Sequence, residues 1–446
     1  MNAPLDRRSF LGFSAATGAL VAAGCQSTRE RTAVAGKLRH GCIGVGGMGG
    51  ADMDQLSSHP DLDVVALCDV DRNFLKAASE KAPAARLYTD WRTMLEKERD
   101  HLDSVNVTTP DHMHAPIAME AIRRGLHVYC QKPLTRTVME ARALAAAARG
   151  AGVVTQMGIQ NHSQTHLRSA RALFEGGHIG PVHSVHVWSD RPKGWWPQGV
   201  GRPEGSDPIP EGLDWDLWCG VSPQRPFKEG NYHPFSWRGW KDFGTGAQGD
   251  MGCHLMDPAT WFLGLGHPTR IRSAGPRPND ETYPLWSRVH YEFPANEHTT
   301  RGPLLLTWYD GGKQVWRELL DELEAGEVLA NACLFMGTEG ALLASSEGPP
   351  RLLPESKFAD VPIEEVAGVN HWHQFVEACL GREEATAGFD YAAHLTEVAL
   401  LGNIALHFPH ESLTWDGKKA RFPDRPEADG YLEVAYREGW EVRGLS

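Results

Sequence analysis

Hydrophobic positions between residues 37 and 160 fall in short apolar runs that are separated by segments with helical spacing. We expect strands in "LRHGCIGV", "DLDVVALCDV", "LDSVNVTTP", "LHVYCQK" and "VVTQMGIQ". Helices are expected in "HAPIAMEAIRRG" and "TVMEARALAAAARGAG". Because strand and helix alternate, the pattern predicts an α/β fold with a doubly wound parallel sheet of the Rossmann type.

The pattern changes after residue 160. A helix in "HLRSARALFEGG" is followed by the strand candidates "VHSVHVW", "TRIRSAG", "SRVHYEF", "LLLTWYD", "ACLFMGT" and "GALLAS", with few helices between them. Consecutive strands of this kind predict an open, mostly antiparallel sheet. We therefore expect a first domain over residues 36–160 and a second α/β domain over 161–446, with helices within 369–408 packing back on the first domain.

A long irregular insertion, residues 191–249, interrupts the second domain and holds six of the 15 tryptophans of the chain. Loops of this length inside a compact domain are usually functional.

The first 35 residues have the pattern of a targeting segment. Arg7 and Arg8 lie just before the apolar run "FLGFSAATGALVAAG", which is too short for a permanent membrane anchor. The pair predicts export by the twin-arginine route and a periplasmic or envelope-anchored mature protein with no integral membrane span. Two processing sites stay open: "AAGC", which would place a lipid anchor on Cys25, and "AVA" at residues 33–35.

Charge and cysteine content narrow the function classes. The formal net charge of −13 argues against nucleic acid as a partner. Of the eight cysteines, Cys42, Cys68 and Cys130 lie inside predicted strands, and the chain has no CxxC pair. We therefore expect free, buried thiols and no disulfide framework.

A glycine turn follows the first predicted strand. Gly44, Gly46 and Gly49 have the GxGxxG spacing that gives a tight turn, close backbone approach to a pyrophosphate, and close packing of helix on strand. Asp69 ends the second predicted strand, where a carboxylate accepts the adenosine ribose hydroxyls. The sequence thus predicts bound NAD. Arg72 keeps NADP open as the less favoured cofactor.

Polar residues also end the later strands. "TTPDHMH" ends the expected strand "LDSVNVTTP", and Lys132 follows the next strand in "QKP". The carboxyl ends of parallel strands border one crevice, so these residues are expected beside the cofactor. For His112 and His114 the alternative is a purely structural role at the start of a helix, without contact to the cofactor. In "GDMGCHLMDPATW", Asp250 and His254 are spaced to share one helix face; a zinc site with Asp257 lacks the usual ligand spacing, and no metal is predicted.

Four of these motifs, "GVGGMG", "TTPDHMHAPIAMEAI", "QKPL" and "GDMGCHLMD", together resemble the glucose–fructose oxidoreductase and inositol dehydrogenase family, Gfo/Idh/MocA. The resemblance implies a Rossmann domain followed by an α/β domain for substrate binding and homo-oligomer contact, as a dimer or tetramer. The family's Glu-Lys-Pro appears here as Gln131-Lys132-Pro133, and its Asp-x-x-x-His pair maps onto Asp250 and His254. The cofactor contacts expected from motif and resemblance are Gly44, Gly46, Gly47, Met48, Gly49, Asp69, Thr109, Pro110, His114, Gln131 and Lys132.

The expected chemistry centres on Lys132, His254 and Asp250. Lys132 would reach the substrate hydroxyl beside the nicotinamide, whose positive charge lowers the pKa of the lysine. His254 would take or relay the hydroxyl proton, and Asp250 would hold the polarity of the site. The tryptophan-rich insertion favours a carbohydrate substrate, because sugar faces pack on flat rings. The expected substrate contacts are His162, Tyr232, His233, Arg238 and Trp240.

These expectations leave three function classes. The favoured one is an exported oxidoreductase with tightly held NAD(P) that removes hydride from a hydroxyl carbon of a sugar, glycoside or polyol. The alternative is an NAD-dependent glycoside hydrolase that works by transient oxidation, elimination and re-reduction. A non-catalytic sugar-binding protein is least supported, because Lys132, Asp250 and His254 occur together. Free NAD is scarce outside the cytoplasm, so an exported enzyme is expected to carry its NAD with it.

Overall fold

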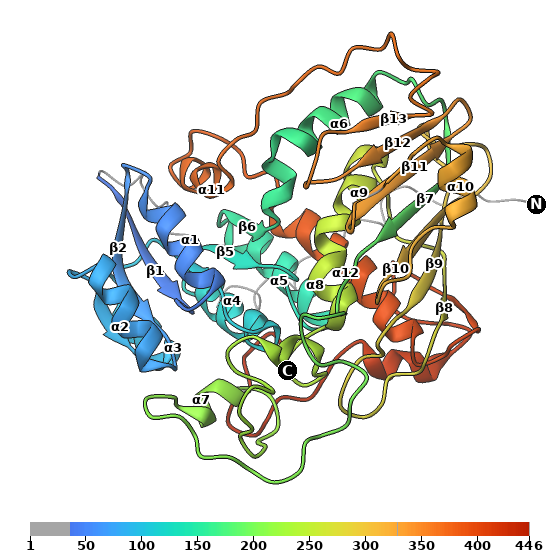
Figure 1. Cartoon of the computed structure of the whole chain (residues 1–446). Helices are drawn as coiled ribbons and strands as arrows, with labels where there is room; N and C mark the ends of the chain where they lie inside the picture. The colour runs from blue at the N-terminus through green and yellow to red at the C-terminus, as the bar shows by residue number, and fades with distance from the viewer. Residues whose placement is uncertain (1–35, 328, 446) are drawn as a thin grey trace, which may run out of the picture. The chain divides into compact units, whose positions relative to one another are not determined.

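The computed structural model describes residues 36–327 and 329–445, whose strands form two β-sheets (Figure 1). Residues 1–35 lie outside the described residues. The twin-arginine segment and the lipid anchor at Cys25 therefore stay predictions.

The first sheet is entirely parallel, with strand order β3-β2-β1-β4-β5-β6. Its strands are β1 Leu38–Ile43, β2 Leu62–Cys68, β3 Arg86–Tyr88, β4 Ser104–Val107, β5 His127–Gln131 and β6 Thr155–Gly158. This confirms the predicted doubly wound fold. Strand β3 was missed because its three residues at the sheet edge are mostly exposed and carry no apolar pattern.

Five helices connect these strands: α1 Met48–Ser57, α2 Arg72–Lys81, α3 Trp91–Lys97, α4 His114–Arg123 and α5 Val138–Ala151. Local sequence sets their ends. Thr137 and Glu140 form a capping box at the start of α5, and Gly152 ends that helix in the left-handed conformation, with φ 63°. The strand order reverses between β1 and β4, which opens a crevice at the carboxyl ends of the strands.

The second sheet has eight strands in the order β13-β12-β11-β7-β10-β9-β8-β14. They are β7 Val182–Trp188, β8 Arg270–Ala274, β9 Arg288–Phe293, β10 Leu304–Tyr309, β11 Ala332–Gly337, β12 Ala341–Ala344, β13 Arg351–Leu353 and β14 Ser412–Thr414. Neighbours are antiparallel except β7 and β10, which run parallel, so the sheet is mixed but mostly antiparallel, as predicted. The two edge strands β13 and β14 are three residues long and were not predicted.

The remaining helices are α6 Thr165–Glu175, α7 Trp215–Cys219, α8 Gly246–Leu255, α9 Asp257–Leu263, α10 Arg317–Glu322, α11 His371–Cys379 and α12 Phe389–Ala405. Helix α12 is buried along most of its length and packs against α5 and α8. Phe375 and Val376 of α11 join a hydrophobic cluster with Leu38, Leu56 and Tyr129 of the first sheet and its helices. The late helices thus connect the end of the chain to the first sheet.

The insertion, residues 191–249, has a hydrophobic cluster of its own. Its members are Leu213, Trp215, Trp218, Cys219, Phe227, Tyr232, Trp237, Trp240 and Phe243, all buried. The rings of Trp215 and Trp218 stack with centroids 4.6 Å apart, and Phe243 meets Trp218 edge-on. Aromatic packing therefore fixes a segment that has little regular secondary structure.

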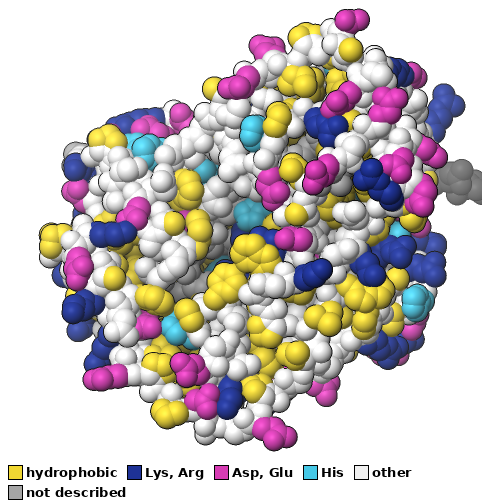
Figure 2. All heavy atoms as spheres, viewed as in Figure 1, with side chains coloured by type: hydrophobic (Ala, Val, Ile, Leu, Met, Phe, Trp, Pro, Cys, Tyr) yellow, Lys and Arg dark blue, Asp and Glu magenta, His cyan; other side chains and the backbone are white. Residues whose placement is uncertain are grey.

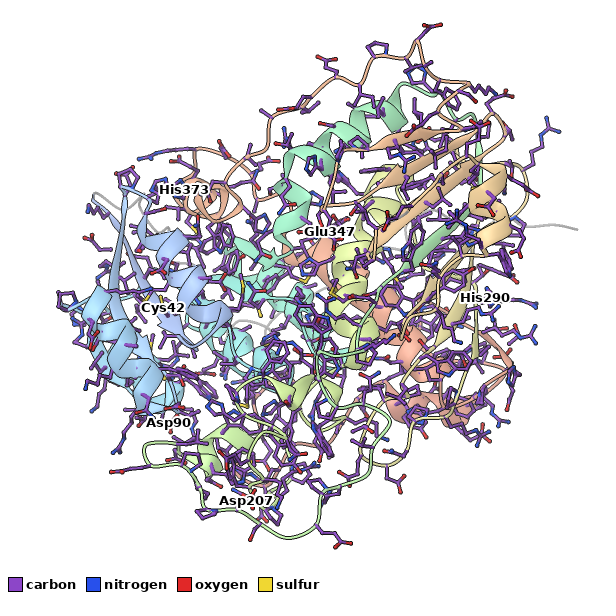
Figure 3. The ribbon with its side chains drawn as sticks, in the orientation of Figure 1. Cys42, Asp90, Asp207, His290, Glu347 and His373 are labelled. Atoms are coloured by element: carbon purple, nitrogen blue, oxygen red, sulfur yellow. The ribbon has the colours of Figure 1, made fainter. Side chains whose placement is uncertain are left out.

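Six cysteines of the described residues are free and buried: Cys42, Cys68, Cys130, Cys219, Cys253 and Cys333. Cys42 lies within β1 of the first sheet (Figure 3). On the face seen in Figure 2, acidic and basic side chains are interspersed. Within the described residues, the helices are too short or too polar to cross a membrane.

Candidate functional site

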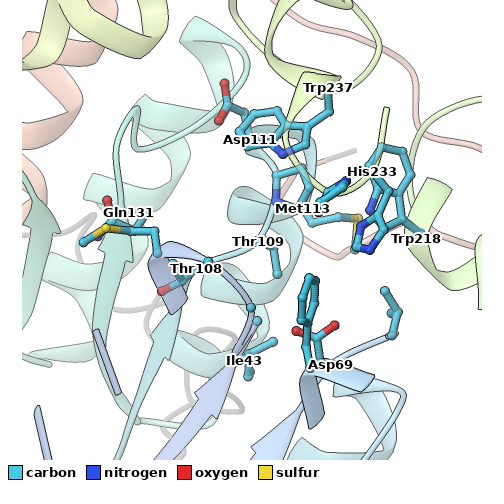
Figure 4. A pocket seen from close by; sticks show the side chains of 18 of the residues that line it. Ile43, Asp69, Thr108, Thr109, Asp111, Met113, Gln131, Trp218, His233 and Trp237 are labelled. Carbon is cyan, nitrogen blue, oxygen red and sulfur yellow. The ribbon is translucent and has the colours of Figure 1, made fainter. Parts of the chain in front are cut away.

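A cavity of about 760 Å³ lies at the carboxyl ends of the first sheet. One wall is the glycine turn and the ends of β1, β2, β4 and β5. The other wall comes from the insertion and α8, so that Trp218, His233 and Trp237 face Ile43 and Asp69 across the pocket (Figure 4). Predicted residues that line it are Gly44, Gly46, Gly47, Met48, Asp69, Thr109, Pro110, Gln131, Lys132, His233, Arg238, Asp250 and His254.

The glycine turn fits a dinucleotide. Gly44 has φ 81°, and a Cβ there would lie 2.4 Å from the carbonyl oxygen of Thr108. A Cβ at Gly49 would lie 2.1 Å from the Gly44 carbonyl oxygen, so only glycine lets helix α1 pack this closely against the turn. Gly49 itself does not line the pocket. Helix α1 begins at Met48 directly after the turn, which points its first N–H groups at the place for a phosphate.

Asp69 is held in place by backbone donors. Its Oδ2 accepts a hydrogen bond from Val45 N at 2.8 Å, and its Oδ1 accepts one from Asp71 N at 2.9 Å. Burial raises the pKa of Asp69, and these N–H groups oppose that shift. Each carboxylate oxygen keeps a further lone pair for a ribose hydroxyl, whereas a 2′-phosphate would meet a carboxylate. The residues present fit NAD.

At the other end of the pocket, Lys132 and Asp250 form an ion pair. Lys132 Nζ donates to Oδ1 and to the backbone oxygen of Asp250, each at 2.8 Å, and Arg238 Nε donates to the same Oδ1 at 3.1 Å. Burial would raise the pKa of Asp250, but the charges of Lys132 and Arg238 outweigh it and hold that pKa well below its usual range. Lys132 is therefore placed by a carboxylate that stays ionised.

His254 lies one helical turn after Asp250 on α8 and also lines the pocket. Burial, followed by the charge of Lys132, lowers its pKa to about 3. Its Nδ1 is buried and has no hydrogen-bond partner among the described residues. His254 is thus neutral at ordinary pH and can hold a proton only briefly.

Asp111 is a pocket residue that the sequence analysis missed. It follows β4 within "TTPDHMH", and its Oδ2 accepts a hydrogen bond from Thr245 Oγ1 at 2.6 Å. Burial, together with the nearby charge of Asp250, raises its pKa to about 7, against the opposing charges of Lys132 and Arg238. A carboxyl group directly after a parallel strand was the signal that could have identified it.

Gln131, which replaces the family's glutamate, has a carboxyl partner. Its Nε2 donates to both oxygens of Asp52 on α1, at 3.1 and 3.0 Å. Asp52 also accepts from Trp372 Nε1 at 2.8 Å and from Thr108 Oγ1 at 2.7 Å, while burial raises its pKa to about 6. A glutamate at 131 would set two carboxyl groups against each other; the amide supplies the donor that Asp52 needs.

The structure corrects the expected cofactor contact of His114. This side chain is buried outside the pocket lining, and its two ring nitrogens lie 2.8 Å from the carbonyl oxygens of Pro133 and Thr109. His112 likewise lies between the carbonyl oxygens of Trp218 and Phe243. Both histidines connect loops around the pocket.

Three expected substrate contacts are also corrected. Tyr232 and Trp240 are fully buried in the insertion's own cluster and do not line the pocket. His162 is buried beside Asp257, with its Nδ1 3.0 Å from the carboxylate, and its ring stacks on Trp261. In an irregular loop, sequence spacing does not show which aromatic side chains are buried in the loop's own core and which line the pocket.

Trp237 and Phe235 are the insertion rings nearest to the charged end of the pocket. The guanidinium of Arg238 lies 4.4 Å from the ring centre of Trp237 and 4.2 Å from that of Phe235, and all three residues line the cavity. Within residues 36–327 and 329–445, no group of three or more His, Cys, Asp or Glu side chains is arranged to hold a metal ion.

Comparisons with known proteins agree with this geometry. Residues 38–159 match the family model GFO_IDH_MocA, an oxidoreductase family with an NAD-binding Rossmann fold, and residues 163–298 match that family's C-terminal alpha/beta domain. The chain is 28% identical over 177 residues to the levoglucosan dehydrogenase of Pseudarthrobacter phenanthrenivorans, covering 40% of this chain and 36% of that one. It is 29% identical over 163 residues to a glycosyl hydrolase family 109 protein of Shewanella sp., covering 30% of this chain and 35% of the relative.

The matched region spans less than half the length of these curated relatives. Among solved structures, a levoglucosan dehydrogenase in complex with NADH superposes with a TM-score of 0.58 at 16% identity, covering 85% of this chain and 99% of the other. That likeness supports the fold. Since the two family models together match more than half of the chain, and the glycine turn, Asp69 and the lysine site lie where such a fold needs them, the chain belongs to the Gfo/Idh/MocA family of NAD-binding oxidoreductases.

Proposed function

We propose that this chain is an exported oxidoreductase with tightly held NAD that removes hydride from a hydroxyl-bearing carbon of a sugar, glycoside or polyol. One observation carries the proposal: a single cavity joins the dinucleotide turn at Gly44 and Gly46 to the ion pair of Lys132 and Asp250. Bound NAD would supply the hydride acceptor. The chain's own residues would bind the sugar, orient its hydroxyl and manage the proton.

Lys132 is the residue best placed to orient the reacting hydroxyl. Its ammonium group, fixed by Asp250, would donate to the hydroxyl oxygen and stabilise negative charge there as the proton leaves.

Asp111 and His254 would share the proton. With a pKa of about 7, Asp111 can accept a proton near neutral pH and hold it, which suits a general base. His254, with its pKa lowered to about 3, would act as a hydrogen-bonding relay. Arg238, Trp237 and Phe235 would hold the remaining sugar hydroxyls and one sugar face.

The alternative is redox-neutral glycoside cleavage. It would need one group to remove the acidified C–H proton and another to protonate the leaving group, and the pocket holds Lys132, Asp111 and His254 for these roles. The likeness to a glycosyl hydrolase family 109 protein supports keeping this candidate.

Export is supported by Arg7 and Arg8 before their apolar run, and Cys25 would carry the lipid in an envelope-anchored form. Leu305 of β10 is 47% exposed and nearby Trp316 is 59% exposed, which supports a contact between copies on the second sheet in a homo-oligomer.

The test begins with full-length protein as purified. Denaturation should release NAD, identified by mass spectrometry and absorbance. Intact protein is then mixed with single sugars, glycosides and polyols, and the appearance of bound NADH is followed by absorbance. A stoichiometric NADH signal with a sugar supports the oxidoreductase. Glycoside cleavage without net NADH supports the alternative, and a protein that binds no nicotinamide nucleotide contradicts both.

A further inference from the structure

The insertion meets the nucleotide-binding wall through its backbone at residues 212–214. Arg72 N, at the start of α2, donates to Gly212 O at 3.0 Å, and Asp214 N donates to Val70 O at 2.9 Å. Asp71 and Leu213 form an antiparallel bridge between these two hydrogen bonds. The insertion therefore adds a strand-like pairing directly beyond Asp69, where β2 ends.

A second contact holds the insertion 20 residues later. His233 Nε2 lies 2.9 Å from Asp71 Oδ2, and the other oxygen of Asp71 caps α2 by accepting from Asn73 N at 2.8 Å. The ring of His233 lies 5.5 Å from that of Phe74, and both rings line the pocket. Asp71 thus connects the helix of the nucleotide wall to the insertion.

Between these two contacts, Leu217 and Trp218 line the pocket, and Trp218 lies opposite Asp69 (Figure 4). Trp218 is fixed on three sides: its ring stacks on Trp215, its edge meets Phe243, and its carbonyl oxygen lies 3.0 Å from His112 Nε2. The segment over the pocket is therefore held at both ends and stiff in the middle.

We propose that residues 211–235 form a clasp over the adenosine end of bound NAD and make it a resident prosthetic group. Asp69 marks the position of the adenosine ribose, and the clasp is hydrogen-bonded to the residues directly after it. NAD leaves only when the contacts at 212–214 and at His233 open together. The inference rests on the proposed function and adds to it: NADH formed from one substrate must be reoxidised in place by a second carbonyl-bearing substrate, or within one redox-neutral cycle.

The first test removes the side-chain contact. His233→Phe keeps a ring against Phe74 but cannot bond Asp71. We expect exchange of bound NAD to become roughly 10- to 100-fold faster, the range for a hydrogen bond to a charged group. Full-length protein is mixed with isotopically labelled NAD, and the bound fraction is measured by mass spectrometry after rapid gel filtration. The control is Lys193→Met, an exposed position of the same insertion that lies outside residues 211–235 and outside the pocket lining. Its exchange rate should stay unchanged.

The second test closes the clasp covalently. A Cβ at Gly212 would lie 3.5 Å from Cβ of Arg72, within disulfide range, so Arg72→Cys combined with Gly212→Cys can lock the segment. Gly212 has φ 93°, so the new side chain is strained and the reduced form of the same variant is the reference. The oxidised form should exchange NAD at least about 10-fold more slowly than the reduced form.

The outcomes separate the clasp from the proposed function. Faster exchange in His233→Phe, or slower exchange in the locked variant, supports the clasp. Bound NAD that exchanges at the wild-type rate in His233→Phe overturns the clasp while the oxidoreductase proposal stands. A protein that never binds NAD overturns both.

Discussion

The two walls of the pocket recognise their ligand in different ways. The first-sheet wall uses backbone: the glycine turn, the start of α1, and Asp69 held by two backbone N–H groups. The insertion wall uses side chains, with Trp218, His233 and Trp237 supported by the buried aromatic cluster of the insertion.

This difference has a physical consequence. A backbone cradle is fixed by the strand–turn–helix around it and tolerates side-chain changes, but it fails when a Cβ enters. A wall of side chains depends on the packing beneath it, so buried residues such as Trp240 should influence the pocket without lining it.

The largest effect is expected at the junction of the two walls. Lys132→Met removes the ammonium group that pairs with Asp250 and should lower turnover by about 10²–10⁴-fold. NAD binding should persist, because the glycine turn and Asp69 are unchanged. Steady-state kinetics and the amount of bound NAD are measured on the same preparation, with Lys193→Met, at an exposed position outside the pocket lining, as the matched control. Near-normal turnover of Lys132→Met would show that Lys132 takes no part in catalysis.

The second prediction tests the support beneath the insertion wall. Trp240→Ala leaves a cavity in the buried cluster and should lower the free energy of unfolding by about 3–5 kcal/mol. Denaturant unfolding measures this change. Trp195→Ala serves as the control, because Trp195 lies in the same insertion but is 48% exposed, and its loss should matter little. Equal effects of the two substitutions would show that the cluster does not support the wall.

The third prediction concerns the backbone-held carboxylate. Asp69→Ala should weaken NAD binding by roughly 10- to 100-fold and relax discrimination against NADP, because the ribose hydroxyls lose a charged acceptor. Calorimetric titration of nucleotide-free protein with NAD and NADP measures both. Asp63→Ala, at an exposed position on β2, the strand that ends just before Asp69, should bind as wild type. A native preference for NADP would contradict the assignment.

The smallest effect follows the pKa of Asp111. Because this pKa is raised to about 7 by burial, the stability it contributes is fully present below the unfolded value and is lost as pH rises through 7. Asp111→Asn cannot ionise, so it should be more stable than wild type by about 1–3 kcal/mol at pH 8, with a smaller difference at pH 5. Denaturant unfolding at the two pH values checks this, with Asp63→Asn as the exposed control. If the difference in the free energy of unfolding between Asp111→Asn and wild type were the same at both pH values, the pH dependence would not come from Asp111.

Local spacing predicted most of the fold and much of the first wall. The alternating runs predicted β1, β2 and β4 to β6, and the glycine spacing with Asp69 predicted the cradle, because one strand–turn–helix unit contains everything that these motifs need. Short edge strands such as β3 and β13 lacked enough residues for a pattern.

The parallel sheet, the dinucleotide turn and the choice of Lys132 as a candidate could be predicted from the sequence, since each depends on residues close together in the chain. The rest of the site depends on contacts between residues far apart in the chain. Asp52 accepts from Trp372 across 320 residues, and His233 reaches Asp71 across 162. The packing of the insertion also buries Trp240 while Trp237 lines the pocket. Such pairings arise when distant segments pack against one another, so no local periodicity records them.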